Sequence, residues 1–272
     1  MSDALPMIPE QRHEFLLDAV RREGVVSIRT LAELLGVSHM TVRRDIVALE
    51  ASGQVVAVKG GVRIASRGAV TSIPLDLERR TRLELPRKIA IARLAAEQVV
   101  DGSIIYLDAG TTCQAMVPFL AQRSGLSVVT NDFHAVVSLF TFPHITTIHT
   151  GGVVDAAAGC SEGEFAARLV ADLNIDTYFA STAGWSISRG VSSPNIEKAQ
   201  LKRAALAASN TAVLVADSTK YGAAAAIKAL SLDSLDLIVT DDELSDETAE
   251  RIKDLGIDLL LAPVDRPTDP RG

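Results

Sequence analysis

The segment from residue 38 to residue 44 combines hydroxyl side chains with two consecutive arginines, a set of residue types suited to binding a nucleic acid. An arginine can bind a guanine through two hydrogen bonds, and serine or threonine can donate to a phosphate or a base. The candidate DNA contacts are Ser38, His39, Met40, Thr41, Arg43 and Arg44. Two arginines on a helix are also typical of an ordinary solvated face, so the surrounding elements must decide between these interpretations.

A second set of polar residues follows short apolar runs in the remainder of the chain. The turn Gly110-Thr111-Thr112 offers backbone N–H groups and two hydroxyls at the start of an expected helix, where an anion such as phosphate is favoured. The candidate ligand contacts are Asp108, Gly110, Thr111, Thr112, Asn131, Gly151, Gly152, Asp217 and Lys220. Each turn is also compatible with a simple helix or strand cap. The convergence of five polar strand ends on one edge favours a small-molecule site.

The sequence gives little support for a metal site, a dinucleotide cofactor or a reactive thiol. The five histidines show no metal-ligand spacing, and no G-x-G-x-x-G motif follows an apolar run, so neither a metal nor a cofactor is expected. Cys113 stands at the start of an expected helix, where a thiol pKa can be lowered, although a packing role is more usual there. Trp185 can cover a bound sugar or fill the core, and the second role is the more usual one.

Helical periodicity predicts two helices before the candidate DNA contacts. The first runs from Pro9 to Arg22, and Gly24 follows as its stop. The pattern Thr30-Leu31-Ala32-Glu33 has the form of a capping box and predicts the start of the second helix, which Gly36 ends. The residues expected to be buried are Phe15, Leu16, Ala19 and Val20 in the first helix and Leu31, Leu34 and Leu35 in the second.

A third helix carries the candidate DNA contacts, with Ser38 as its expected N-cap. Apolar residues recur at helical spacing along its other face, namely Val42, Ile46 and Leu49. The apolar stretch from Val55 to Ile64 then predicts a β-hairpin, with Lys59 near its tip placed to reach a phosphate. This order of elements is the layout of a winged helix-turn-helix, in which the last helix enters the major groove of DNA.

Charge separates this head from the rest of the 272-residue chain. Residues 1–68 carry a net charge of +1, residues 69–88 carry +2 and residues 89–272 carry −10. We therefore predict a DNA-binding domain at 8–65, a linker at 66–87 with a short charged helix in its second half, and a second domain at 88–264. The sequence shows neither a signal segment nor an apolar run of membrane-spanning length, so a cytoplasmic protein without membrane contact is expected.

The second domain alternates apolar runs with segments of helical composition. The runs expected to be strands are 103–107, 127–130, 146–150, 177–180, 212–216, 235–240 and 258–261. The helical segments are 88–100, 112–122, 165–173, 197–209 and 246–255. This alternation predicts an α/β fold with a mostly parallel sheet covered by helices on both faces. Ligands of such sheets bind at the carboxyl ends of the strands, where the second set of polar residues lies.

Together, these motifs closely resemble the DeoR family of bacterial transcription regulators. The family pattern V-S-x-x-T-[IV]-R-R-D-[LI] matches Val37–Ile46, and its H-G-G-A matches residues 59–62 with Lys59 in place of histidine. The patterns D-A-G-T-T, T-N-[DE], G-G and D-[HS]-[ST]-K-[FY]-G match residues 108–112, 130–132, 151–152 and 217–222, and Lys88-Ile89-Ala90 matches K-x-I-A. The resemblance covers about residues 12–262.

Membership of that family implies a second domain related in fold to ribose-5-phosphate isomerase and the CoA transferases, with a phosphorylated sugar as its effector. By this resemblance, the turn at residues 110–112 holds the phosphate, and Asp217 and Lys220 hold the sugar end. Two positions depart from the family pattern. Lys198 stands where an acidic residue is frequent, and the turn Ser181-Thr182-Ala183-Gly184-Trp185 matches only loosely.

The sequence thus predicts a transcriptional repressor of a sugar-catabolism operon that is not an enzyme. One head with a charge of +1 would bind DNA weakly, so we expect a homo-oligomer, a dimer or a tetramer, to bind double-stranded operator DNA. A phosphorylated sugar is expected to control its affinity. Two alternatives stay open. One is an isomerase-like enzyme with a regulatory head, in which Asp108, Asp217 and Lys220 are acid/base groups. The other is an activator, which would share every site.

Overall fold

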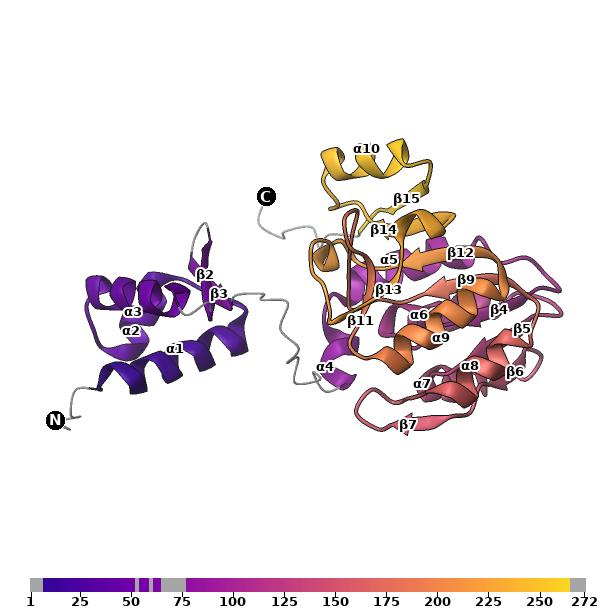
Figure 1. Ribbon diagram of the computed structural model, residues 1–272, viewed down its shortest axis with the longest axis horizontal. Coiled ribbons are helices and arrows are strands. Elements are labelled where there is room, and N and C mark those ends of the chain that lie inside the picture. Colours follow the sequence, from indigo (N-terminus) through magenta and orange to yellow (C-terminus); the bar gives the residue numbers. More distant parts are fainter. Residues whose placement is uncertain (1–6, 52–53, 59–60, 65–76, 265–272) are drawn as a thin grey trace, which may run out of the picture. The chain divides into compact units, whose positions relative to one another are not determined.

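A computed structural model shows that the protein consists of two compact units, with the boundary between residues 69 and 70 (Figure 1). The structure describes residues 7–51, 54–58, 61–64 and 77–264. No helix within these ranges combines the length and the apolar character needed to cross a bilayer. The first unit has one hydrophobic core and the second has two, so the units are described separately.

The first unit is a helical head with a small antiparallel sheet. Its elements are α1 (Pro9–Glu23), β1 (Val25–Val26), α2 (Ile28–Leu35), α3 (His39–Ala51), β2 (Val55–Val58) and β3 (Gly61–Ile64). The strand order is β1-β3-β2, with antiparallel pairs. Gly36 adopts a left-handed φ of 63° after α2, which lets the chain turn sharply into α3. The expected winged helix-turn-helix is therefore present, and β1 is a strand that the sequence pattern did not predict.

The core of the head confirms the expected buried face of α3. Val42, Ile46 and Leu49 are at most 4% exposed and pack with residues of α1, α2 and the hairpin. Their spacing places one side of α3 against the core, so the other side faces solvent. In α1, Phe15 is only half-buried, and Leu17 takes a place in the core instead.

The start of α2 and its buried face differ from the expectation. The helix begins at Ile28, because the Ser27 hydroxyl accepts the N–H of Thr30 at 3.0 Å and so forms the N-cap. Thr30 is therefore a residue of the first turn and not the cap. Leu31 and Ala32 are buried, whereas Leu34 is 51% exposed, which corrects its expected place in the core.

The second unit is built on a seven-stranded parallel sheet. Its strand order is β15-β14-β12-β9-β4-β5-β6. The bounds are β4 (Ile104–Leu107), β5 (Ser127–Thr130), β6 (Thr146–His149), β9 (Ile175–Ala180), β12 (Ser209–Val215), β14 (Leu237–Asp241) and β15 (Asp258–Ala262). Every neighbouring pair is parallel. All seven expected strands are present, which confirms the α/β fold with a mostly parallel sheet.

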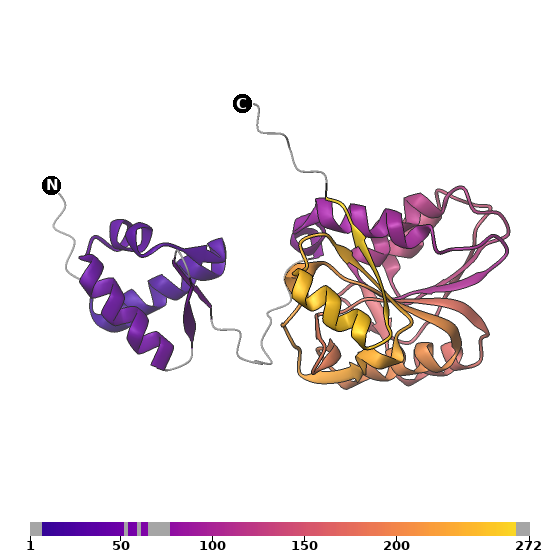
Figure 2. The ribbon, with the colours of Figure 1, turned by 90° about the horizontal axis from the view of Figure 1, so that it is seen from above.

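Helices cover both faces of this sheet. The α-helices of the second unit are α4 (Leu77–Arg82), α5 (Leu85–Ala96), α6 (Thr111–Met116), α7 (Phe133–Leu139), α8 (Glu164–Ala171), α9 (Ile196–Ala207) and α10 (Asp246–Asp254). Alternate strand residues face the two layers: in β4, Ile105 and Leu107 pack with α5, α6 and α7, while Tyr106 packs with α8 and α9. Figure 2 shows the purple α5 and the orange α9 on opposite sides of the sheet.

Several elements of this unit depart from the predicted bounds. Helix α5 begins at Leu85, inside the predicted linker, because Pro86 fits the first turn of a helix, where its missing N–H is not needed. Helix α6 continues as the 3₁₀ helix η1 (Val117–Leu120). The sequence pattern did not predict α7, the hairpin of β7 (Val153–Asp155) and β8 (Cys160–Glu162), or the sheet of β10 (Gly184–Ser186), β11 (Gly190–Ser193) and β13 (Ile227–Leu230). The 3₁₀ helices η2 (Ser218–Lys220) and η3 (Leu232–Ser234) complete the unit.

Candidate functional site

The start of α3 holds two of the candidate DNA contacts in a helix cap. The Ser38 Oγ accepts the N–H of Thr41 at 3.1 Å, and it lies 2.9 Å from the Thr41 Oγ1. Ser38 is thus the N-cap, as the sequence predicts. Both hydroxyls therefore have a structural role at the helix start, in addition to any contact with DNA.

The buried side of α3 is tied to α1 by a charge cluster. The Asp45 carboxylate accepts two hydrogen bonds from the Arg12 guanidinium, at 2.9 Å and 3.0 Å. The His13 Nε2 lies 3.2 Å from the same carboxylate. Burial alone would raise the Asp45 pKa, but Arg12 and His13 outweigh it and hold the pKa below the ordinary value of 3.8. The acidic residue that follows the two arginines is therefore an anchor that fixes α3 on α1.

The opposite side of α3 is open to solvent. His39, Met40, Arg43 and Arg44 are all exposed. Within the residues that the structure describes, neither arginine forms an ion pair or a side-chain hydrogen bond. Both guanidinium groups are therefore available to an external partner. Lys59, expected at the hairpin tip, lies outside the described residues.

In the second unit, the strand order creates a switch point between β4 and β9. From β4, the chain adds β5 and β6 on one side and later β9, β12, β14 and β15 on the other. Ligands of such sheets bind at the carboxyl ends of the strands that flank this point. We refer to the ends of β4, β9 and β12 as the carboxyl edge. Six of the nine candidate ligand contacts follow β4 or β12 at this edge, namely Asp108, Gly110, Thr111, Thr112, Asp217 and Lys220.

A buried ion pair joins the first residues after β4 and β9. The Lys202 Nζ of α9 pairs with the Asp108 Oδ2 and donates to the Ser181 carbonyl at 2.8 Å. The Asp108 Oδ2 also accepts the N–H of Ser181 at 3.0 Å. Both charged side chains are at most 6% exposed. A Cβ at Gly110 would lie 2.7 Å from the Ser181 Cβ, so only glycine allows this close approach. The pair is internally neutralised and holds the two strand ends together.

The turn after β5 supports the turn after β4. The Asn131 Oδ1 accepts the N–H of Ala109 at 2.9 Å and the Tyr106 hydroxyl at 3.0 Å. The Asn131 Nδ2 donates to the Ser161 carbonyl at 2.8 Å. The side chain is 1% exposed, so both oxygen lone pairs are occupied inside the protein. The structure therefore places Asn131 where it orients the Gly-Thr-Thr turn through the backbone of Ala109.

The start of α6 retains part of the expected set of donors. The N–H of Gly110 is already occupied, because it donates to the Asp132 Oδ2 at 3.1 Å. The N–H groups of Thr111, Thr112 and Cys113 have no partner among the described residues. The Thr112 hydroxyl is buried and also lacks a hydrogen-bond partner among the described residues. These four donors, without Gly110, are the ones that could meet an anion here.

A cation follows β12 at the same edge. The Lys220 Nζ donates to the Thr182 carbonyl at 3.2 Å and lies 3.7 Å from the Asp217 Oδ2. The turn that carries it is fixed from β14, because Asp241 accepts the Ser218 N–H at 2.7 Å and the Ser218 hydroxyl at 2.6 Å. Asp241 is fully buried, so water does not compete for these two hydrogen bonds. Lys220 is thus held at the carboxyl edge, with 28% of its side chain exposed.

The structure places a second lysine near this cation, Lys88 of α5. Its side chain is 4% exposed, and its Nζ donates to the Arg80 carbonyl. Burial and then repulsion by Lys220 lower the Lys88 pKa from 10.5 to about 8, against the attraction of Asp217 and Glu84. Two ammonium groups from different elements therefore lie close enough to repel each other. An anion between them would relieve this repulsion.

Two expected contacts lie at the outer strands of the sheet. Gly151 and Gly152 follow β6, which is four strands from β12, or about 19 Å at the usual strand spacing. The N–H of Gly151 donates to the His149 Nδ1 at 3.0 Å. A Cβ at Gly152 would lie 2.6 Å from the Glu162 carbonyl oxygen. The structure therefore gives these glycines a role in packing β6 against the β7–β8 hairpin, at a distance from Lys220.

Lys198, which departs from the family pattern, is paired with two carboxylates. The Lys198 Nζ lies 2.6 Å from the Asp155 Oδ2 and 3.6 Å from the Glu162 Oε2, both on the β7–β8 hairpin. Burial lowers the Lys198 pKa, but the hydrogen bond to Asp155 outweighs it and raises the pKa above 10.5. The lysine thus stays charged and ties the hairpin to α9.

Cys113 and Trp185 have the packing roles that are usual for these residues. Burial raises the pKa of the Cys113 thiol far above its ordinary value, which argues against a reactive thiolate. Trp185 is fully buried, and its ring lies edge-on to Tyr221 with centroids 4.9 Å apart. The side chains of both residues are therefore packing groups of the core.

The candidate contacts derived from the sequence omit Lys88 and Lys202, although a signal for both was present. Lys88 shares a helical face with Ile91, Ala92 and Ala95, all of which are buried. Lys202 shares a face with Ala199 and Ala205 in the same way. A lysine on the apolar face of a helix must be desolvated on folding. Such a position indicates either a buried ion pair or a binding residue.

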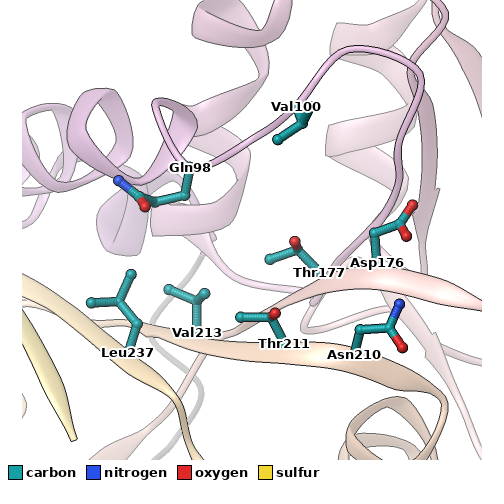
Figure 3. A pocket seen from close by; sticks show the side chains of 8 residues that line it. All are labelled: Gln98, Val100, Asp176, Thr177, Asn210, Thr211, Val213 and Leu237. Atoms are coloured by element: carbon teal, nitrogen blue, oxygen red, sulfur yellow. The ribbon is translucent and has the colours of Figure 1, made fainter.

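A pocket of about 420 Å³ lies at the amino ends of the strands, away from the carboxyl edge (Figure 3). Its lining consists of Gln98, Val100, Asp176, Thr177, Asn210, Thr211, Val213 and Leu237. The Asp176 carboxylate already accepts the N–H of Ile104 at 2.8 Å. The lining contains no lysine or arginine, so this pocket offers no counter-charge to a phosphate.

Two family models match the chain and together cover most of it. The model described as the DeoR-like helix-turn-helix domain matches residues 12–67, and the model described as the DeoR C-terminal sensor domain matches residues 84–242. The first match contains α3, and the second contains the carboxyl edge with Asp108, Lys202 and Lys220.

The chain is also similar along most of its length to named regulators. An uncharacterised helix-turn-helix regulator, YgbI of Escherichia coli K12, is 43% identical over 94% of this chain and 99% of its own length. The glycerol-3-phosphate regulon repressor of the same strain is 28% identical over 85% of this chain and 90% of its own length. Among solved structures, ribose 5-phosphate isomerase A of Methanocaldococcus jannaschii is 16% identical, with a TM-score of 0.36 over 49% of this chain and 53% of its own.

Proposed function

Because the chain belongs to the DeoR family of helix-turn-helix transcriptional regulators, and is therefore a regulator and not an enzyme, we propose that it represses a sugar-catabolism operon under the control of a phosphorylated sugar. The observation that carries the effector half of this proposal is the set of free donors at the carboxyl edge. The start of α6 and Lys220 offer N–H groups, a hydroxyl and an ammonium to an anion. The glycerol-3-phosphate regulon repressor is among its relatives, which supports a small phosphorylated polyol or sugar as the effector.

We assign DNA recognition to the exposed side of α3. The side chains that would meet base edges are His39, Met40, Arg43 and Arg44, since all four are exposed and α3 is fixed from behind by Asp45. Ser38 and Thr41 would contact phosphate at the helix start, and Lys59 would contact a neighbouring phosphate from the hairpin. A homo-oligomer, a dimer or a tetramer, would place two heads on the half-sites of an operator.

We assign the effector phosphate to the N–H groups of Thr111 and Thr112, the Thr112 hydroxyl and Lys220. Asp217 would accept a sugar hydroxyl next to Lys220, because its carboxylate is buried at the same turn. Asp108 and Asn131 would hold this site in shape through Lys202 and the backbone of Ala109. Gly151 and Gly152 would support it indirectly through the hairpin.

A thermal-shift screen of the full-length protein against sugar phosphates and the matching free sugars tests the effector class. A ligand that binds only the folded protein stabilises it by about 2.7 kcal/mol at one hundred times its dissociation constant. We expect at least one hit that requires the phosphate. Silence across the panel, or equal shifts with the free sugars, would contradict the proposed effector and leave the DNA-binding assignment intact.

The direction of control requires a second experiment. Expression from the target promoter should rise in a strain that lacks the protein, because repression is lost. A fall in expression would identify an activator instead.

A further inference from the structure

Helix α8 presents large apolar side chains to solvent. Phe165 is 73% exposed, and Leu169, one turn later on the same side of the helix, is 36% exposed. The inner side of α8 is satisfied, because Ala166 and Val170 are fully buried in the core that α8 shares with α9. Figure 1 shows α8 and α9 next to each other on one face of the sheet. The outer side of α8 therefore has the apolar character of a surface that a partner covers.

Strand β7 continues this apolar surface. Val153 and Val154 are 63% and 60% exposed, and within the described residues β7 pairs with β8 alone. A Cβ at Gly163 would lie 3.8 Å from the Val153 Cγ2, so Val153 lies beside the residue that precedes α8. We refer to Val153, Phe165 and Leu169 as the α8 surface. Single exposed apolar residues are common, but a group of three from two neighbouring elements is a feature of interaction sites.

The charges on α8 make this surface complementary to itself. The acidic Glu164 precedes Phe165, and the basic Arg168 precedes Leu169, and both charged side chains are more than 70% exposed. A second α8 that lies antiparallel across the first brings Phe165 to Leu169 of the partner subunit, because a two-fold axis reverses the order of the residues. The same reversal brings Glu164 to Arg168 of the partner subunit. The charge pattern therefore fits a second copy of this chain.

The net charge of the second unit also favours the α8 surface as the point of contact. This unit carries a net charge of −8, so two copies repel each other where acidic residues predominate. On α8, by contrast, Glu164 and Arg168 balance each other beside the apolar residues. Helix α7 also exposes apolar side chains, namely Val137 and Phe140, but it carries no acidic residue, lysine or arginine that would orient a second copy.

We propose, on the basis of the function proposed above, that the α8 surface is the face through which two copies of this chain associate, with their α8 helices antiparallel across a two-fold axis. Phe165 and Leu169 of both copies form the apolar centre of the contact. Glu164 and Arg168 form ion pairs between the copies at its rim and fix the orientation. The homo-oligomer that an operator with two half-sites requires is thus assembled by the second units.

The first test measures the molar mass of the full-length protein by light scattering over a range of concentrations, for the wild type, Phe165→Ser and Phe140→Ser. Phe140, at the end of α7, is 72% exposed and is therefore a matched control for Phe165. Circular dichroism checks that each variant is folded. We expect Phe165→Ser to raise the dissociation constant of the dimer at least about tenfold, as is usual for an aromatic residue at the centre of an interface. Phe140→Ser should associate as the wild type does.

The second test reverses charges on α8. Glu164→Arg places two arginines opposite each other in each contact, and Arg168→Glu places two glutamates there, so each variant alone should associate at least about tenfold more weakly than the wild type. An equimolar mixture of the two variants should regain the wild-type affinity, because arginines of one copy then meet glutamates of the other. Charge reversal is needed because loss of a single exposed ion pair changes little. An effect within one chain could not be relieved by mixing.

The outcomes separate this proposal from the proposed function. Wild-type mass in Phe165→Ser and in both charge variants would place the contact elsewhere and overturn the proposal, as would dissociation in Phe140→Ser alone. A mixture that stays dissociated would overturn the antiparallel arrangement. A monomeric wild type would leave the α8 surface to another occupant, such as the head of the same chain, and would overturn the proposal as well. None of these results removes a phosphate-dependent thermal shift, which tests the effector half of the proposed function independently.

Discussion

At the residue scale, three buried or half-buried lysines at the carboxyl edge differ in what neutralises them. Lys202 has Asp108 as a direct counter-ion, whereas Lys220 lies 3.7 Å from Asp217 and, among the described residues, Lys88 donates to the Arg80 carbonyl and contacts no carboxylate directly. The first lysine is therefore paired inside the fold, and the other two are the ones available to the proposed ligand. This difference would allow a unit with a net charge of −8 to attract a phosphate, because the local charge at the edge is not that of the whole unit.

The affinity for a sugar phosphate should depend on pH through Lys88. Its pKa of about 8 reflects burial and the repulsion by Lys220 and Arg80, against the attraction of Asp217 and Glu84. The protonated form binds the anion, so affinity should fall as the pH rises from 7 to 9. Above a pH of about 6 the phosphate is already mostly doubly charged, so its own titration does not oppose this trend. Calorimetry across this range tests the prediction, and Lys88→Met should show a clearly flatter profile.

Arg43 and Arg44 should account for much of the operator affinity. Each arginine of α3 is exposed and unpaired among the described residues, so Arg43→Ala and Arg44→Ala should leave the fold intact. Loss of a bidentate base contact would weaken operator binding about 5- to 150-fold. A gel-shift titration measures this loss, with Arg251→Ala, an exposed arginine of α10, as the control. Footprints equal to those of the wild type in both variants would refute the assignment of α3.

At the element scale, the sequence predicts an element well where one pattern determines it. The spacing of Val42, Ile46 and Leu49 specifies the buried side of α3, and the seven apolar runs of the second unit all form strands. The predicted start of α2 was wrong because Ser27 and Thr30 can both cap a helix, and only the backbone conformation decides between them. The β7–β8 hairpin was missed because Val153 and Val154 are exposed, so its first strand shows no alternation of buried and exposed residues.

The candidate ligand contacts could likewise be predicted only in part. The sequence predicts which residues follow each strand, and hence the presence of Asp108, Asp217 and Lys220 at one edge. It does not reveal which of these polar groups are used up inside the protein, as those of Asn131 are. It also does not place Lys88 beside Lys220, because that proximity arises from the packing of α5 against the sheet.

The attachment of α3 to α1 should depend on Asp45. Asp45→Asn removes the charged partner of Arg12 and should lower the free energy of unfolding of the head by about 1–2 kcal/mol. Since the folded Asp45 pKa lies below its ordinary value of 3.8, its contribution is complete above that value and is lost as the pH falls through the folded pKa. Urea unfolding at pH 7 and at pH 3 measures both effects. Asp18→Asn, at an exposed pair with Arg21, should cost close to nothing, and equal losses in the two variants would contradict the anchor role.

At the scale of the whole molecule, two units of different charge divide the work. The head presents the two exposed arginines of α3, and the acidic second unit holds the proposed effector edge, whose lysines lie in α5, α9 and η2. The effector can change DNA binding only if it prefers one conformation of the chain over another.

The most direct test of this account is an operator-binding titration of the full-length protein with and without the sugar phosphate found by the screen, repeated with Lys220→Ala. The account predicts that the sugar phosphate weakens operator binding by the wild type at least about fivefold, the lower end of ordinary coupling between two sites. Lys220→Ala should bind the operator as the wild type does and show no response to the ligand. Operator affinity that stays the same when the sugar phosphate is bound, or an unaltered response in Lys220→Ala, would contradict the claim that a phosphorylated sugar at the carboxyl edge controls this regulator.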